Sequence, residues 1–100
     1  MPANTTSRVL YVVSKYTETD TVDLLGRSKN RYFSMARNIA FYLLYRTGHS
    51  QVSICRIFRR GQSTVSMAIS RIEALRLRPG IMRRAIINME LELNLQQLGG

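Results

Sequence analysis

With 100 residues, the chain can bury one small hydrophobic core, which predicts a single domain and excludes a second one. Hydrophobic residues make up 45% of the chain and Gly and Pro are few, which is typical of globular proteins and excludes a disordered chain. Fifteen Lys and Arg against six Asp and Glu give a formal net charge of +9, and 13 of these cations are arginine, whose planar guanidinium suits phosphate oxygens and guanine edges. Nucleic acid is therefore the leading candidate partner.

The single cysteine and the short apolar runs indicate the compartment. One cysteine cannot form an internal disulfide, and no leader suggestive of secretion opens the chain, so we expect the protein to be cytoplasmic. The longest apolar run, residues 39–44, is far too short to span a bilayer, and we expect no membrane insertion.

Apolar residues at helical spacing predict an all-α fold, a single small domain of five to six helices. Residues 1–6 are polar and without periodicity, so we predict a flexible N-terminal tail before a domain over residues 7–98. The predicted helices lie over residues 7–17, between Asp20 and Gly26, over residues 32–46, between Ser50 and Arg59, and over residues 62–77 and 81–95. A basic loop, GRSKNR at residues 26–31, separates the second helix from the third.

Only three residues, Arg59-Arg60-Gly61, join the fourth and fifth predicted helices. Two helices with such a turn make a helix-turn-helix, whose second helix enters the major groove of DNA. In the first helix of the pair, four side chains are expected to face the core: Val52, Ile54, Ile57 and Phe58. The second is expected to turn Val65 and Ala68 inward and to present four side chains to the groove: Gln62, Ser63, Ser66 and Met67.

Four stretches of the chain follow a recognisable family pattern: VLYVVSKYTETDTVDLL at residues 9–25, GRSKNR at residues 26–31, ARNIAFYLL at residues 36–44, and SQVSICRIFRRGQSTVSMAISRI at residues 50–72. Together they resemble the C-terminal DNA-binding domain of the bacterial replication initiator DnaA. The last stretch is the most specific, being similar to the family's S-L-x-x-I-G-x-x-F-G-G-R-D-H-S/T-T-V-x-x-A-x-x-K-I. No G-x-x-x-x-G-K-S/T phosphate loop occurs, so nothing resembles the family's nucleotide-hydrolysing domain and we expect a stand-alone DNA-binding protein.

The resemblance implies that the basic loop enters the minor groove through Arg27, Lys29 and Arg31. A narrow minor groove concentrates negative potential, which attracts inserted arginine. The alternative is a solvated surface turn. The charge distribution favours DNA, because nine cations and no acid lie between Leu24 and Ile72, whereas ordinary soluble surfaces intersperse the two signs.

The resemblance also implies which residues of the helix-turn-helix contact DNA. Ser63 and Thr64 align with paired hydroxyls of the family, although Thr64 alternatively caps its helix. Gln62 stands where the family has its histidine, and a glutamine there can bond adenine bidentately. The family's G-G-R-D-H is one residue shorter here, so its acid is absent too.

Arg60 and Arg71 match an arginine and a lysine of the family pattern, whereas Arg59 replaces a glycine and adds an expected phosphate contact. Ser50 and Gln51, at the start of the first motif helix, can also bond a phosphate. These five contacts are expected to position the protein on the DNA rather than to read bases, and Ser66 remains one of the groove-facing residues named above.

Arg37, His49 and Cys55 can each be interpreted as structural residues. Arg37 matches a conspicuous arginine of the family and either anchors the central helix or binds phosphate. His49 is interpreted as a turn residue, and Cys55 as a small packing residue. One histidine and one cysteine cannot assemble a recognisable metal cluster, and no catalytic pattern occurs, so we predict a non-enzyme without metal or cofactor.

The last predicted helix has more apolar residues than one stripe needs, including Ala85, Ile87 and Leu91. They either pack across the core or form a homodimer seam or a docking face for another protein. Two functions are therefore compared. One is sequence-specific binding of double-stranded DNA by a small transcription or replication regulator, and the other is a protein-interaction adaptor with only weak, non-specific DNA contact. A third interpretation is association with RNA or an anionic membrane surface, since a charge of +9 attracts any polyanion.

Overall fold

The structure of the protein is a computed structural model that describes residues 2–26 and 31–95. The described residues form six helices and no strand, which confirms the all-α prediction. The helices are α1 (Pro2–Thr17), α2 (Thr21–Leu25), α3 (Arg31–Arg46), α4 (Gln51–Phe58), α5 (Gln62–Leu77) and α6 (Ile81–Glu92). The bounds of α2 to α5 agree with the predicted helices to within a residue.

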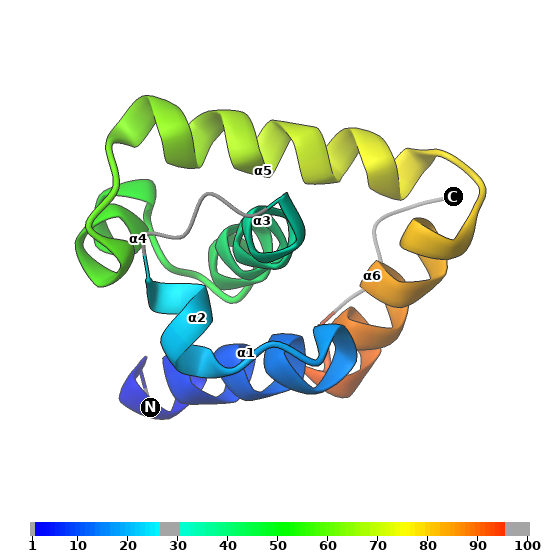
Figure 1. Cartoon of the computed structure of the whole chain (residues 1–100), viewed down its shortest axis with the longest axis horizontal. Helices are drawn as coiled ribbons and strands as arrows, with labels where there is room; N and C mark the ends of the chain where they lie inside the picture. Colours follow the sequence, from blue (N-terminus) through cyan, green and yellow to red (C-terminus); the bar gives the residue numbers. More distant parts are fainter. Residues whose placement is uncertain (1, 27–30, 96–100) are drawn as a thin grey trace.

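Helix α3 is the centre of the molecule. Figure 1 shows it nearly end-on, with α5 on one side of it and α1 on the other. It packs against α1, α2, α4 and α5, and the consecutive residues Phe41, Tyr42, Leu43 and Leu44 are all buried, as expected for a helix surrounded by others. The Phe41 and Phe58 rings meet edge to face with centroids 4.6 Å apart, which fixes α4 against α3. Helix α3 is therefore the support on which the helix-turn-helix is built.

The connection from α3 to α4 is set by local sequence signals. Gly48 has a φ of 111°, which favours glycine, and the His49 N–H that follows bonds the Leu44 carbonyl at 3.0 Å, as in a Schellman helix end. Ser50 then caps α4, because its hydroxyl accepts a hydrogen bond from the Ser53 N–H at 3.1 Å. These two ends lie where the sequence predicts them.

Helix α1 begins at Pro2 and not at Ser7, so residues 2–6, which the sequence predicts to be a tail, continue the helix. Proline suits the first helical position, because its fixed φ is helical and no intrahelical partner exists there for the missing N–H. Thr6 Oγ1 lies 3.0 Å from His49 Nε2, which ties the early part of α1 to the α3–α4 connection. His49 is thus a turn residue that also anchors α1.

The prediction that Val52 faces inward is wrong. Its side chain is 51% exposed, whereas Ile54 and Phe58 are buried. Val52 lies two residues before Ile54, or about 200° round the helix, so the two side chains cannot share one face. The predicted inward-facing set of this short helix therefore included one residue too many.

Helix α6 ends at Glu92, before the predicted end at Leu95. Asn94 adopts a left-handed conformation with a φ of 59°, and the Leu95 N–H bonds the Glu90 carbonyl at 2.9 Å. Asparagine tolerates this conformation better than most residues, so Leu-Asn-Leu is a helix end that could have been recognised in the sequence.

Packing uses most of the apolar residues of α6. Ile86, Met89 and Leu93 are buried, and Ala85 is partly buried against the same core. Of the other two members of the predicted surplus, Ile87 is half-buried and Leu91 is exposed.

A buried ionic cluster joins α3, α5 and α6. The Glu90 carboxylate, which is fully buried, accepts hydrogen bonds from Arg76 Nε and Nη2, both at 2.9 Å, and from Arg46 Nη1 at 3.0 Å. The Tyr42 hydroxyl donates to the same carboxylate at 2.5 Å. Burial, and then the hydrogen bond to Glu90, raise the pKa of Tyr42 to about 12. Two guanidinium groups and a phenol therefore satisfy a charge that would be very costly to bury alone.

Candidate nucleic-acid interface

Helices α4 and α5 have the form of a helix-turn-helix. Helix α4 ends at Phe58, α5 begins at Gln62, and Arg59, Arg60 and Gly61 make the turn. Gly61 is the N-cap residue of α5 and has no side chain to bond its first N–H groups. Thr64 lies within the first turn of α5, so it does not take the capping position that was its alternative role.

Arg59 ends α4 in a left-handed conformation, with φ 54° and ψ 50°. Its N–H and that of Arg60 both bond the Cys55 carbonyl, which closes the helix. A side chain in this conformation costs roughly 1–2 kcal/mol, which is why glycine is usual there. The Arg59 side chain is exposed and forms no ion pair or hydrogen bond with the described residues. The turn therefore presents an exposed guanidinium at a strained position.

Arg60 points back into the protein. Its Nη1 donates to the Phe58 carbonyl at 2.9 Å and its Nη2 to the Gly26 carbonyl at 2.7 Å. The sequence predicted Arg60 as a DNA contact, whereas in the structure its guanidinium bonds two backbone carbonyls. It ties the turn of the helix-turn-helix to the residue at the start of the basic loop.

Arg37 holds the same segment from α3. It is 5% exposed, and it donates from Nε to the Leu24 carbonyl at 2.8 Å and from Nη2 to the Asp23 carbonyl at 3.1 Å. Burial, and then the nearby charge of Arg60, lower the pKa of Arg37. Of its two interpretations, these contacts support the structural anchor. Two arginines thus fix the end of α2.

One side of α5 presents a row of free side chains. Thr64, Met67 and Arg71 follow one another at spacings of three and four residues, so they share a side of the helix, and all three are exposed. Ser63 is also exposed and lies one turn before Met67. Among the residues that the structure describes, none forms an ion pair or a side-chain hydrogen bond with this row.

Gln62 and Ser66 lie away from that row. Gln62 is two residues before Thr64, or about 200° round the helix, and Ser66 is one turn beyond Gln62. Gln62 is exposed at the start of α5, and Ser66 is half-buried. The predicted base-contacting residues of α5 are therefore divided between two sides of the helix.

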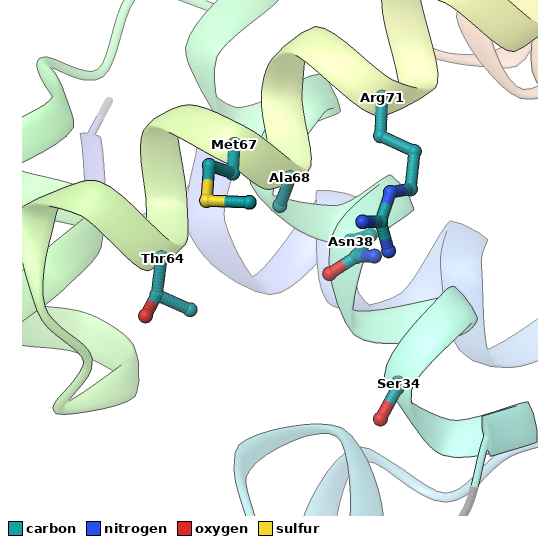
Figure 2. A pocket seen from close by; sticks show the side chains of 6 residues that line it. All are labelled: Ser34, Asn38, Thr64, Met67, Ala68 and Arg71. Carbon is teal, nitrogen blue, oxygen red and sulfur yellow. The ribbon is translucent and has the colours of Figure 1, made fainter.

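An open groove of about 280 Å³ lies between α5 and α3 beside this row. In Figure 2 side chains from both helices surround it: Ser34 and Asn38 of α3, and Thr64, Met67, Ala68 and Arg71 of α5. We call it the α3–α5 groove. The sequence did not single out Ser34 and Asn38, although two polar residues four apart on a largely apolar helix were a readable signal.

The sequence pattern of the bacterial DnaA protein helix-turn-helix matches residues 6–72, which is more than half of the chain and includes α4 and most of α5. The chain belongs to this family. The match confirms the resemblance found in the sequence, and it identifies a DNA-binding domain and not a catalytic one. No curated protein matches the chain.

Part of the basic loop of this DnaA-family domain lies outside the described residues. Arg27 and Lys29 fall there, and Arg31 is the first residue of α3. Gly26, the first residue of the loop and the last described one before residue 31, is the one whose carbonyl bonds Arg60.

Helix α4 contributes a further exposed arginine to the DnaA-family domain. Arg56, which the sequence did not single out, is exposed without an ion pair to the described residues. Of the residues predicted at the start of this helix, Ser50 is the cap described above, and Gln51 is half-buried at the first helical position.

Between Leu24 and Ile72, the interval that contains no acid, folding reduces the number of cations that are available to DNA. Glu90, from outside the interval, pairs with Arg46 at 3.0 Å. Arg37 and Arg60 are engaged with carbonyls. Among the arginines of this interval whose side chains the structure describes, Arg56, Arg59 and Arg71 are exposed without an ion pair.

The described ranges contain no candidate metal centre, since no three His, Cys, Asp or Glu side chains lie together there. None of the helices within these ranges is long and apolar enough to cross a membrane. Cys55 is half-buried and packs against the core, in agreement with its interpretation as a packing residue.

Proposed function

We propose that this DnaA-family domain binds double-stranded DNA sequence-specifically and acts as a small cytoplasmic regulator of transcription or replication. In the proposed complex α5 enters the major groove, and the basic loop of residues 26–31 enters the adjacent minor groove. The main support is the exposed row of Thr64, Met67 and Arg71 on the second helix of a helix-turn-helix, with no described partner inside the protein.

The contacts around the turn support a common face for the two DNA-binding elements. The bond of Arg60 to the Gly26 carbonyl fixes the start of the basic loop to the segment before α5. A helix in the major groove and a neighbouring basic segment in the minor groove can then engage one duplex, as in other helix-turn-helix variants.

The proposed contacts have two kinds of role. Base edges are read by hydroxyl and amide groups, and phosphates are bound by guanidinium groups and the start of α4. The proposed base contacts are Gln62, Ser63, Thr64 and Ser66. The proposed phosphate contacts are Ser50, Gln51, Arg59 and Arg71. Arg60 has a positioning role in this scheme.

The test is a selection of bound duplexes from a random DNA pool, followed by Kd measured against salt on the selected duplex and on a scrambled one. We expect the selected duplex to bind about 10³-fold more tightly. Ser63→Ala removes a single hydroxyl contact and should weaken binding to the selected duplex by about 1 kcal/mol, while leaving the scrambled one nearly unchanged. Arg71→Ala should weaken both and reduce the salt slope by about one.

Arg78→Ala is the matched control, since Arg78 is exposed and unpaired among the described residues but follows the far end of α5. It should leave both affinities unchanged. A failure to enrich any site, with steep salt dependence on every duplex, would contradict sequence-specific reading.

A second candidate function is a protein-interaction adaptor or homodimer that uses the α5–α6 end of the molecule. Leu77 and Ile81 are 77% and 84% exposed there, and Leu91, near the other end of α6, is 54% exposed. Sedimentation of the Leu77→Ser/Ile81→Ser variant tests it. Loss of self-association with unchanged DNA binding would support this candidate, and a monomeric wild type would remove its homodimer form.

A further inference from the structure

Met67 is a large apolar side chain in the middle of a polar surface. It is 63% exposed, although it lies on α5 between the hydroxyls of Ser63 and Thr64 and the guanidinium of Arg71. Single exposed apolar residues are common on proteins, so exposure alone decides nothing. The position of Met67 within the α3–α5 groove is the informative observation.

Met67 is part of a small apolar patch that opens to solvent. Figure 2 shows the Thr64 and Met67 side chains extending from α5 into the same groove, with Ala68 between α5 and α3. Asn38 and Arg71, which also line the groove, give it polar edges. An apolar centre with polar edges favours a ligand that has one apolar group among several polar ones.

Met67 is not needed to hold α5 in place. The residues that attach α5 to the core are buried on its other side: Val65, Ile69 and Ile72. Core packing therefore does not explain a methionine at this position, and its replacement should leave the fold intact.

The major groove of DNA contains such a ligand. Thymine presents a C5-methyl group there, and it is the one base of the four with a methyl group on this edge. The thioether of methionine is flexible and polarizable, is at most a weak acceptor, and adapts to apolar surfaces of different shape. We propose that Met67 determines specificity by packing against the C5-methyl group of a thymine, next to the Thr64 side chain. This inference rests on the proposed function and adds an apolar contact to the hydrogen-bonding contacts assigned above.

Deoxyuridine, which is thymidine without this methyl group, gives a direct test. In the selected duplex each thymine is replaced singly by deoxyuridine, and Kd is measured for the wild type, Met67→Ala and Met67→Leu. For the wild type we expect one or two positions at which the replacement weakens binding about fourfold, the effect of no longer burying one methyl group. Met67→Ala should bind the thymine and deoxyuridine duplexes equally at those positions, and Met67→Leu should keep part of the difference. Thermal unfolding of each variant checks that the fold is retained.

The outcomes separate this inference from the proposed function. If the wild type prefers the selected duplex over the scrambled one but no deoxyuridine position matters, only the inference about Met67 is overturned. The same holds if Met67→Ala keeps the full effect of the missing methyl group. If the wild type shows no preference between selected and scrambled duplexes, the proposed function itself fails.

Discussion

Arg59 is the residue at which local energetics and proposed function conflict most clearly. Its φ of 54° and ψ of 50° belong to the region that glycine occupies without strain. Its side chain has no ion pair or hydrogen bond to the described residues that would compensate the strain. An arginine retained under strain and free of internal contacts is what a phosphate-binding role would require.

Arg59→Gly should therefore separate stability from binding. The free energy of unfolding should rise by roughly 0.5–1 kcal/mol, because relief of the left-handed strain is partly offset by the larger entropy that glycine loses on folding. DNA affinity should fall, and the salt slope should decrease by about one as one phosphate contact is lost. Urea unfolding and titrations at several salt concentrations measure the two effects.

Arg59→Asn is the companion variant, since asparagine also tolerates the left-handed region but has no charge. It should reproduce the loss of salt slope. An unchanged slope in both variants would mean that Arg59 does not contact phosphate.

At the scale of the helices, the main result is how α2, α3 and the helix-turn-helix are joined. Arg37 from α3 and Arg60 from the turn bond the carbonyls of Asp23, Leu24 and Gly26. These carbonyls lie at the end of α2, directly before the basic loop. The two proposed DNA-binding elements are therefore linked through backbone contacts and not only through packing.

Arg60→Lys tests this link without changing the charge. A lysine has one ammonium group and cannot reproduce two bonds made by separate guanidinium nitrogens. We expect the free energy of unfolding to fall by roughly 1–2 kcal/mol, and the affinity for the selected duplex to fall with an unchanged salt slope. Chemical unfolding and DNA titrations measure these effects.

Arg59→Lys makes the same change at the neighbouring exposed position and should behave nearly as the wild type. If Arg60→Lys also folds and binds as the wild type does, the link has no role in placing the DNA-binding elements.

The limits of sequence-based prediction also appear at this scale. Helix ends were predictable where a local signal such as Gly48 or Ser50 sets them, because such signals act within one turn of helix. The anchoring role of Arg60 was not predicted, and that of Arg37 could not be separated from phosphate binding, because their partners are carbonyls that carry no sequence signal. The spacing of Ser34 and Asn38 was a readable signal of a shared polar face, but their place in a groove was not predictable, because it depends on α5 lying beside them.

At the scale of the whole molecule, the Glu90 cluster joins the last helix to the rest of the fold. Its members come from α3, α5 and α6, and their separations in sequence range from 14 residues for Arg76 to 48 for Tyr42. No pattern in the sequence could have brought them together. Through this cluster Glu90, which lies outside the interval between Leu24 and Ile72, neutralises Arg46 within it.

This cluster predicts a loss of stability at alkaline pH. The pKa of Tyr42 is about 12 in the folded protein against an ordinary value of 10, so between these two pH values the folded state keeps a proton that the unfolded state has lost. The contribution is fully present below pH 10 and is lost as the pH rises to 12, by roughly 2–3 kcal/mol in total. Urea unfolding at intervals from pH 9 to pH 12 measures it.

Tyr42→Phe isolates this effect. The contacts of Lys15 and Tyr16 with Glu92 raise both of their pKa values, so these groups also titrate at alkaline pH, but they do so in wild type and variant alike. The variant should start from a lower stability, because the hydrogen bond to Glu90 is gone, and should lose less as the pH rises. Parallel curves for the two proteins would show that Tyr42 keeps an ordinary pKa.

The way α6 closes the core also determines which segment can be transplanted into another protein. The family pattern ends at Ile72, inside α5, whereas that helix continues through Arg76 to Leu77. A chimaera made with residues 6–72 alone would carry Arg46 without Glu90 and would uncover the part of the core that Ile86 and Met89 fill. The graft should therefore extend over residues 2–95, so that the recognition helix arrives with the helix that supports it.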